Sequence, residues 1–517
     1  MVMKRNIYIP FIILTISSLA SGCGSSKMSY PEPVLPLSDN AFVSYAGTFK
    51  IGSYEYDADY GTIAVPENRN KTASRLIHLP VIRIHARSAT PREPIFYLAG
   101  GPGQSNMNCK PFDTLLVEHD FVMVGYRGVD GSTTLDCPEV VDALKRNDDP
   151  LSEESLRNLA HAWGASARRF AQQGIDWNGY TIPQTIEDME AVRLTLKYKR
   201  INLQSESYGT RVAYLYGLMH PESIHRTIMI GAAPPGGFLW DSHMVDQQLN
   251  DYALLWSRDS LLSARCPDLT GAMRRALQTM PKRYLFFSLN PGKIKIAAFG
   301  MLFHRQTAAL VFDAFVKADE GDYSGLALLS AAYDYIVPSM FVWGDLASKA
   351  VSADLDSVRI IATCTEASNS ILGSPMNTLL WKPLLYDRIP IQPLPEELRI
   401  LRHSDVETLI LSGSVDFSDP PKNATYGLLP YLRNGKQIIL SEFGHVGDLL
   451  YLQKQSTERM MASYYNTGIP DTSGVKYIPM NFNVQWSLPS IAKTAFLTAA
   501  LVLMSLAAGI FWIAKRM

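Results

Sequence analysis

The sequence has 517 residues and a formal net charge of -1, with 47% hydrophobic and 19% charged residues. That length exceeds one ordinary domain, and the apolar content is ample for a packed core. The balanced charge gives no reason to expect a nucleic acid or an acidic surface as a partner. We therefore expect one large domain with an insertion, or two domains.

The N-terminal residues 1–23 have the composition of a secretory signal. Two basic residues precede the apolar run Ile7–Ala20, and small residues then lead into Cys23. This pattern predicts a lipoprotein-type signal peptide in which Cys23 becomes the lipidated first residue. The alternative is an uncleaved signal anchor with an incidental cysteine. Residues 24–46 are rich in Ser, Pro and Gly and are expected to form a tether.

An uncharged stretch, Thr494–Ala514, lies close to the C-terminus. About 20 apolar residues suffice to cross a bilayer as a helix. We predict a spacer over 471–490 and a transmembrane helix over 491–514, which anchors the protein in the inner membrane of a bacterial envelope. The rest of the chain would then lie in the periplasm or outside the cell. A buried core helix and a sorting tail that is later removed are the alternatives.

Five cysteines fit such an oxidising compartment. If Cys23 carries the lipid, four remain, and an even number favours two disulfides. Four cysteines allow three pairings. We expect Cys109–Cys137 and Cys266–Cys364, because each pair falls within one region of the chain, and free buried thiols are the alternative. The spacings do not resemble a metal site, so neither a metal nor a cofactor is expected.

Strand and helix patterns alternate through residues 47–236. Two alternating runs, Tyr60–Val65 and Leu76–Ile84, predict antiparallel edge strands. Acidic residues in the first turn predict a helix over Thr185–Leu194 with Thr185 as its N-cap. Further strands are expected over Pro94–Ala99, Phe121–Val124, Ile201–Gln204 and Thr227–Ile230, with a helix over Thr210–Met219. This alternation is typical of an α/β fold with a mostly parallel sheet and helices on both faces.

The alternation is lost from 237 to 400, where apolar residues follow helical spacing. The strand pattern resumes over 401–470, with Thr408–Ser412 and Gln437–Leu440 as strands. We therefore predict a helical lid over 237–400 that interrupts one sheet domain.

Ser207 is the first candidate for chemistry. It lies in the turn Ser205–Gly209, which resembles the nucleophile elbow G-x-S-x-G except that Ser205 replaces the first glycine. Such a turn exposes the serine oxygen at a helix N-terminus, where backbone N–H groups point outward. An ordinary loop serine is the alternative.

The loop Gly100–Gly103 follows a predicted strand and is rich in glycine. A phosphate-binding loop would need a Lys-Ser/Thr pair, which is missing here. The other interpretation is an oxyanion hole, made by the N–H groups of Gly101, or its neighbour, and Tyr208.

Asp416 follows a strand, where a carboxylate can hold an imidazole in one tautomer, and His445 lies in a glycine-flanked turn. Asp419, ahead of Pro420, fits a structural turn aspartate better. The order Ser207, Asp416, His445 is that of α/β-hydrolases, which predicts a catalytic triad on that fold. A non-catalytic scaffold of the same fold is the alternative.

Several motifs resemble the proline iminopeptidase and tripeptidyl aminopeptidase family of serine aminopeptidases. They are GGPG, YRGVDGSTTLDCPE, SESYGTR, GSVDFSDPP and FGHVG, and the resemblance spans roughly residues 55–450. It implies an exopeptidase that releases one or a few residues from peptide N-termini through an acyl-enzyme. Such an enzyme needs an anion for the substrate's ammonium, and Glu206 and Glu366 are the candidates. A lipid-linked esterase or lipase with the same triad is the main rival.

Overall fold

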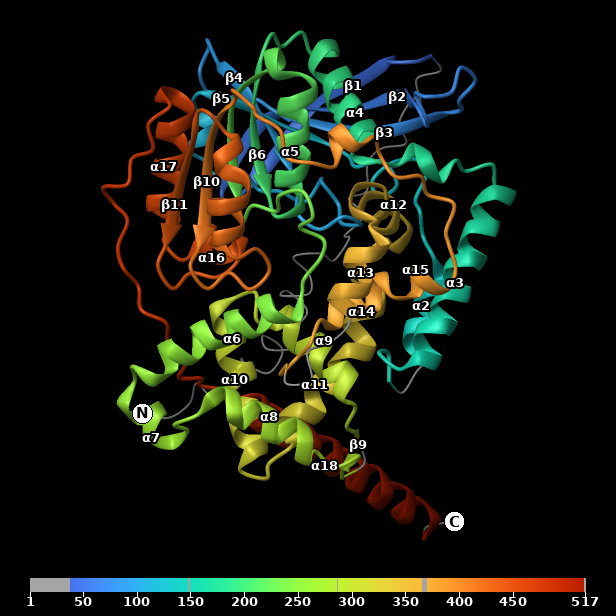
Figure 1. The fold of residues 1–517 in the computed structure, drawn as a ribbon, viewed down its shortest axis with the longest axis vertical. Helices are drawn as coiled ribbons and strands as arrows, with labels where there is room; N and C mark the ends of the chain where they lie inside the picture. Colours follow the sequence, from blue (N-terminus) through green and yellow to red (C-terminus); the bar gives the residue numbers. More distant parts are fainter. Residues whose placement is uncertain (1–37, 147–148, 286, 365–369, 516–517) are drawn as a thin grey trace.

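The computed structural model describes residues 38–146, 149–285, 287–364 and 370–515. The predicted signal peptide and Cys23 lie outside these residues. A large sheet with flanking helices forms one half of the molecule, and a group of helices lies against one end of it (Figure 1). The chain thus separates into a sheet region and a helical region.

Nine strands form the sheet in the order β1-β2-β3-β5-β4-β6-β7-β10-β11. The pairs from β1 to β5 are antiparallel, and those from β5 to β11 are parallel, which confirms the mostly parallel sheet. Its central strands are buried along almost their whole length, because helices cover both faces. The strands are β1 (Phe42–Ile51), β2 (Tyr54–Pro66), β3 (Leu76–Ile84), β4 (Arg92–Leu98), β5 (His119–Val124), β6 (Ile201–Glu206), β7 (Ile224–Ile230), β10 (Glu407–Gly413) and β11 (Gly435–Leu440).

Three predictions about boundaries and edges are wrong. The tether predicted over 24–46 runs into β1, whose residues pair with β2 from Phe42 onward. Since β1 forms the edge, β2 and β3 are internal strands rather than edge strands. The helix predicted from Thr185 begins earlier, at Ile182, with Thr181 as N-cap and a proline in its first turn.

Helices pack around the sheet and also fill the segment between β7 and β10. The helices of the sheet region are α4 (Ile182–Thr195), α5 (Tyr208–Met219), α16 (Val446–Tyr451) and α17 (Lys454–Thr467), whereas α2 (Pro138–Arg146) and α3 (Glu153–Gln172) pack against each other and lie beside α15 (Pro383–Tyr386) (Figure 1). We call the segment between β7 and β10 the insertion. Its helices are α6 (Ser242–Ser257), α7 (Ser260–Arg265), α8 (Leu269–Thr279), α9 (Pro291–Met301), α10 (Arg305–Asp319), α11 (Ser324–Ile336), α12 (Trp343–Asp354), α13 (Ser357–Cys364), α14 (Pro375–Trp381) and α15 (Pro383–Tyr386), together with the short hairpin β8 (Arg283–Tyr284) and β9 (Phe287–Ser288).

The insertion has an apolar core of its own, which includes Trp256, Phe299 and Phe312. Helix α12 differs from the rest, because all its residues are buried and several of them join the core of the sheet region. The insertion is therefore partly built into the sheet region. Its role as a lid stays a prediction.

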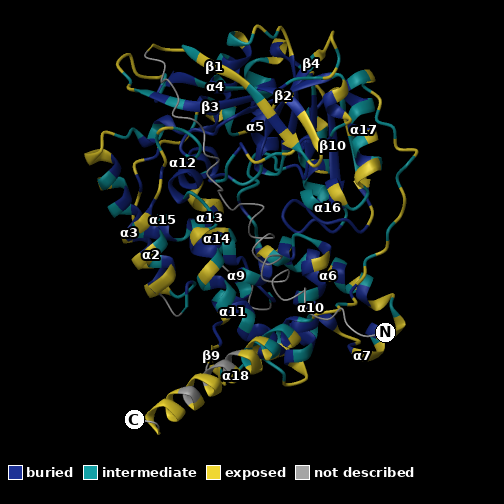
Figure 2. Cartoon of the chain, turned by 180° about the vertical axis from the view of Figure 1, so that it is seen from behind, coloured by how far each residue is buried: buried dark blue, intermediate teal, exposed yellow. Residues whose placement is uncertain are grey.

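Helix α18 (Leu488–Ala514) begins against the insertion and then extends away from the body (Figure 1). Lys493 pairs with Asp322 at 2.6 Å near its start, whereas its described apolar side chains from Leu497 onward are exposed (Figure 2). Within the described residues, no single helix combines the length and hydropathy of a membrane span. One bent pair, Ser324–Ser339 with Trp343–Asp354, passes by length and composition alone, with an angle of 81° between its halves. The span expected over 491–514 stays a prediction.

Candidate active site

Ser207 stands at the sharp turn between β6 and α5. Its backbone has φ 49° and ψ -120°, a combination that costs a non-glycine residue of order 1–3 kcal/mol. Its N–H donates to the Ile230 carbonyl at 2.9 Å, which ties the turn to the end of β7. Gly209 has to be glycine, because a Cβ there would stand 2.1 Å from the carbonyl oxygen of Leu98. The surroundings hold a strained serine at the carboxyl end of the sheet, as a nucleophile elbow requires.

Ser205 occupies the place of the missing glycine at no evident cost to the turn. Its side chain is fully buried, and its Oγ donates a hydrogen bond to the Ile228 carbonyl at 2.9 Å. The buried hydroxyl thus has a hydrogen-bond partner on β7. The departure from the usual motif is compatible with an intact turn.

The glycine loop after β4 passes directly over the nucleophile. A Cβ on Gly100 would stand 2.9 Å from Cβ of Ser207, and Gly101 has φ +62°. Among the described contacts, neither the N–H of Gly101 nor that of Tyr208 donates a hydrogen bond. Both N–H groups are therefore available to an oxyanion at the turn, which is the arrangement expected for an oxyanion hole.

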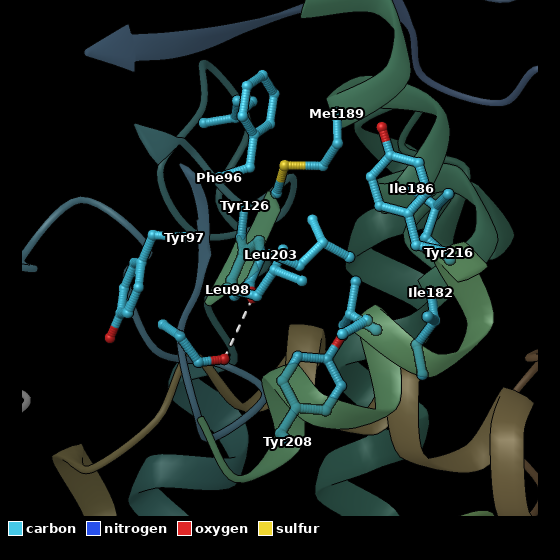
Figure 3. Packing of buried hydrophobic residues seen from close by; sticks show 14 of the residues in the cluster. Phe96, Tyr97, Leu98, Tyr126, Ile182, Ile186, Met189, Leu203, Tyr208 and Tyr216 are labelled. Atoms are coloured by element: carbon cyan, nitrogen blue, oxygen red, sulfur yellow. Dashed lines mark hydrogen bonds between the residues drawn. The ribbon is translucent and has the colours of Figure 1, made fainter. Parts of the chain in front are cut away.

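Asn106 fixes this loop from below, a role that the sequence did not reveal. Its side chain is fully buried. The Asn106 Oδ1 accepts from the N–H of Ala99 at 2.7 Å, and Nδ2 donates to the carbonyls of Tyr97 and Val124 at 2.9 and 2.8 Å. Beside it, the Tyr126 hydroxyl donates to the Ala99 carbonyl at 3.1 Å (Figure 3). One side chain thus joins β4, β5 and the loop.

Helix α12 holds the far end of the same loop. The N–H of Gly103 donates to Asp345 Oδ2 at 2.8 Å, and its carbonyl accepts from the N–H of Val342 at 2.8 Å. The ammonium of Lys349 pairs with Asp345 and donates to the Arg127 carbonyl at 3.3 Å. The loop that faces Ser207 is therefore braced by the insertion as well as by the sheet.

Asp416 and His445 form a buried pair at the ends of β10 and β11. His445 Nδ1 lies 2.8 Å from Asp416 Oδ2, and the other oxygen of Asp416 accepts the N–H groups of Ser418 and Asp419. Burial favours the neutral ring, but the nearby carboxylates outweigh it, Asp416 most strongly, and raise the pKa of His445 to about 9. The structure brings this predicted acid and base together as a triad requires of those two members.

Gly231 connects this pair to the nucleophile. It follows Ile230, the acceptor for Ser207, and a Cβ on Gly231 would stand 2.8 Å from Cε1 of His445. The Ser207 hydroxyl makes no hydrogen bond to the imidazole within the described part of the chain. Instead, His445 Nε2 lies 3.9 Å from Asp419 Oδ2. Catalytic hydrogen bonds are often long in ligand-free enzymes and close only with substrate.

The two predicted ammonium anchors have different outcomes. Glu366 lies outside the described residues. Glu206 adjoins Ser207 and is half-buried, and it accepts from the Tyr97 hydroxyl at 3.0 Å and from the Gln204 amide at 3.4 Å. Burial raises the pKa of Glu206 to about 7, although these hydrogen bonds favour the charged form. The residue that directly precedes the nucleophile thus carries a carboxyl that titrates near neutrality.

The predicted disulfides are wrong. Cys109, Cys137 and Cys266 are free thiols, which excludes both expected pairs. Cys137 is buried, and its Sγ lies 3.6 Å from the Leu135 carbonyl oxygen. Cys109 instead interacts with Tyr97 and Glu206. Nearness in the sequence does not bring these side chains together. In the described residues no group of three or more His, Cys, Asp or Glu is placed to hold a metal ion.

The chain is similar to several known proteins over part of its length. Residues 93–271 match the family model described as alpha/beta hydrolase fold. The tripeptidyl aminopeptidase of Streptomyces lividans is 28% identical over 208 residues, which cover 37% of this chain and 38% of that protein. The serine protease Hip1 of Mycobacterium bovis is 24% identical over 225 residues, 40% of this chain and 42% of that protein. The matched region thus spans less than half the length of each relative.

Solved structures that match the chain include a meta-cleavage product hydrolase of Pseudomonas fluorescens. It is 12% identical, with a TM-score of 0.36, and the match covers 76% of this chain and 95% of that one. An esterase from Exiguobacterium antarcticum is also 12% identical, with a TM-score of 0.32 and coverages of 78% and 98%.

Proposed function

We propose that the chain is a serine hydrolase of the α/β-hydrolase family, and more specifically an aminopeptidase of the proline iminopeptidase and tripeptidyl aminopeptidase kind. It would release one or a few residues from free peptide N-termini. The observation that carries the proposal is the negative charge around the triad residues: Glu206 directly precedes Ser207 in the chain, and the carboxyl of Asp419 lies 3.9 Å from His445 Nε2. A negative charge there favours a substrate with an ammonium group close to its scissile bond.

The proposed reaction uses the three triad residues in their usual roles. His445 takes the proton of Ser207 as the hydroxyl attacks the scissile carbonyl, and Asp416 holds the imidazole at Nδ1 throughout. The N–H groups of Gly101 and Tyr208 stabilise the oxyanion, and one such donor is commonly worth about 3–4 kcal/mol. The imidazolium then protonates the leaving amine. Water, activated by the same base, releases the acyl group.

We also propose that the enzyme is anchored in the inner membrane, with its catalytic domain in the periplasm or outside the cell. The support is α18, whose described apolar side chains stand in the solvent after it leaves the insertion. A helix with such side chains is stable in a bilayer and unfavourable in water. Lipidation of Cys23 would add a second anchor. Protease protection of the C-terminal residues in vesicles, compared with a variant lacking 488–517, tests the anchor.

A peptide library with free and blocked N-termini, analysed by mass spectrometry, tests the activity. We expect cleavage of the free peptides alone, lost in Ser207→Ala. An esterase would instead hydrolyse short-chain esters and leave aminoacyl- and tripeptidyl-anilides intact. A scaffold without activity would show no Ser207-dependent labelling by a fluorophosphonate.

A further inference from the structure

Asp419 is not the structural turn residue that the sequence suggests. Its side chain is buried, with 5% of its surface exposed, and its Oδ2 lies 3.9 Å from Nε2 of His445. This is the ring nitrogen that Asp416 does not occupy. Oδ2 also accepts from the Ser418 hydroxyl at 3.1 Å, whereas Oδ1 makes no hydrogen bond to any described residue. One oxygen of Asp419 therefore remains available to a ligand at the catalytic base.

The loop that carries Asp419 is fixed on both sides. The N–H of Asp419 donates to Asp416 Oδ1 at 2.8 Å, which folds the loop back on the acid. From the insertion, Trp240 Nε1 donates to the Ser418 carbonyl at 2.9 Å, and Gln248 Nε2 donates to the Asp416 carbonyl at 2.5 Å. These contacts keep one carboxyl at each nitrogen of the imidazole.

Other acidic groups around His445 do not compete for the same role. Asp448 of α16 accepts the N–H groups of Gly444 and Arg305 through Oδ2, and its Oδ1 lies 3.7 Å from His304 Nδ1. Glu206, from the end of β6, has each of its oxygens hydrogen-bonded to a neighbouring side chain. The other neighbour from the insertion is uncharged, the ring of Phe303 at 5.5 Å. Among these carboxyl groups, Asp419 is the one that lies near His445 Nε2 and has an oxygen without a hydrogen bond to the described residues.

We propose that Asp419 couples the charge of the substrate's α-ammonium to the protonation of His445. Without substrate, Asp419 attracts the imidazolium and keeps its Nε2–H away from Ser207. An ammonium bound at Asp419 Oδ1 compensates this negative charge. The imidazolium then gives its Nε2 proton to solvent water and, now neutral, accepts the hydrogen bond of Ser207. This inference rests on the proposed aminopeptidase function and names the group through which the same site recognises a free N-terminus.

The electrostatics agree with this order of events. Burial raises the pKa of Asp419 to about 7, although the charge of His445 opposes the rise. Because water no longer solvates this buried carboxyl, a cation bound beside it at neutral pH stabilises its charged form. A positive charge within about 4–6 Å of an imidazolium lowers its pKa by about one or more pH units. A free amine on the substrate would thus activate the base under conditions where a blocked substrate would not.

The test compares wild type with Asp419→Asn, which keeps the shape and removes the charge. Asp405→Asn is the matched control, because Asp405 lies just before the opposite end of β10 with its side chain 70% exposed. Two rates are measured against pH: kcat for an aminoacyl-anilide with free or acetylated amine, which reports the base in the substrate complex, and labelling of Ser207 by a neutral fluorophosphonate, which reports the base in the free enzyme. Thermal unfolding of each variant verifies the fold.

For wild type and Asp405→Asn we expect the acid limb of kcat for the free amine to lie about one pH unit below that of labelling. In Asp419→Asn the two limbs should coincide, and kcat/KM for the free amine should fall about 10-fold or more. If Asp419→Asn keeps both the difference between the two acid limbs and the preference for the free amine, the role of Asp419 is wrong, and the aminopeptidase proposal is unaffected. If wild type hydrolyses free and acetylated substrates equally, the aminopeptidase proposal fails together with this inference.

A measurement on wild type alone keeps the inference testable if Asp419→Asn does not fold. Methylammonium chloride is added to the labelling reaction at pH 7, with sodium chloride at the same ionic strength as the control. We expect methylammonium to accelerate labelling several-fold. Equal rates in the two salts would contradict the coupling.

Discussion

Gly231 lies against the imidazole of His445, since a Cβ on this residue would stand 2.8 Å from Cε1 of the ring and 3.3 Å from Asp416 Oδ2. Its φ of +62° also favours glycine. Because Gly231 directly follows the acceptor for the Ser207 turn, a single stretch of backbone sets the spacing between nucleophile and base.

Gly231→Ala is expected to lower the rate of fluorophosphonate labelling about 10- to 100-fold, because a displacement of the ring by about 1 Å is enough for such a loss. Gly52→Ala is the matched control, since Gly52 has φ +59° and no atom within 4 Å of an added Cβ. Both variants should lose about 1 kcal/mol of stability through backbone strain. Equal labelling by the two would show that Gly231 does not space the site.

Ser205→Gly restores the usual elbow motif and is expected to cost stability rather than to gain activity. The variant loses the hydrogen bond to Ile228 and gains backbone freedom in β6, together about 1–2 kcal/mol in the free energy of unfolding. Urea unfolding measures this loss, with Ser205→Ala to separate the hydrogen bond from the backbone term. A labelling rate more than 10-fold above wild type would mean that Ser205 impairs the turn.

The sequence predicted the sheet well, because its central strands are uniformly buried and end in recognisable turns. The residues at those ends, Ser207, Asp416 and His445, could be named from their turn motifs and their order in the chain, since parallel strands present their carboxyl ends at one edge. Strand β1 could not be found in this way. Most of its side chains are exposed or half-buried, so it has no hydrophobic pattern and is held by pairing with β2.

Asn106→Ala should reduce kcat more than it raises KM, because the side chain positions the loop and stands apart from the substrate. The change leaves the N–H of Ala99 and two carbonyls without their partner, and we expect about a 100-fold fall in kcat, the size seen when an oxyanion donor is misplaced. Anilide kinetics on the folded variant measure the effect. The control is Asn178→Ala, which removes a hydrogen bond to the exposed Pro390 carbonyl. A rise in KM alone would point to a binding role.

The pair Asp416–His445 predicts a specific dependence of stability on pH. The pKa of His445 rises to about 9 in the folded protein, above the value of about 6.5 for an unfolded chain. Its contribution is therefore fully present below pH 6.5 and is lost as the pH rises through 9. We expect the difference in unfolding free energy between wild type and Asp416→Asn to be largest near pH 6 and to shrink up to pH 9. A difference that grows over this range would contradict the charged pair.

The thiols offer a direct check on the missing disulfides. Burial raises the pKa of Cys137 to about 12, so iodoacetamide at pH 8 should leave this residue unmodified in the folded protein. After denaturation without reductant, Cys109, Cys137 and Cys266 should all be alkylated. A cross-linked peptide that contains Cys109 and Cys137 would restore the original prediction.

Neither the free thiols nor the position of Asp419 could be predicted from spacing. A disulfide depends on the directions of two Cβ atoms, and proximity along the chain does not determine them. Asp419 precedes two prolines and so resembles any turn aspartate. Only the folded loop, held by Asp416 and by Trp240 of the insertion, turns its carboxyl toward the imidazole.

The brace between Gly103 and α12 limits how this protein could be re-engineered. If the insertion were exchanged for that of a relative, Asp345 and Lys349 would be lost. Asp345 accepts the N–H of Gly103 in the loop that faces Ser207, and Lys349 pairs with Asp345. A working chimera would have to retain this helix from the recipient and exchange only the stretches on either side. The insertion is in this respect part of the catalytic framework rather than a separable module.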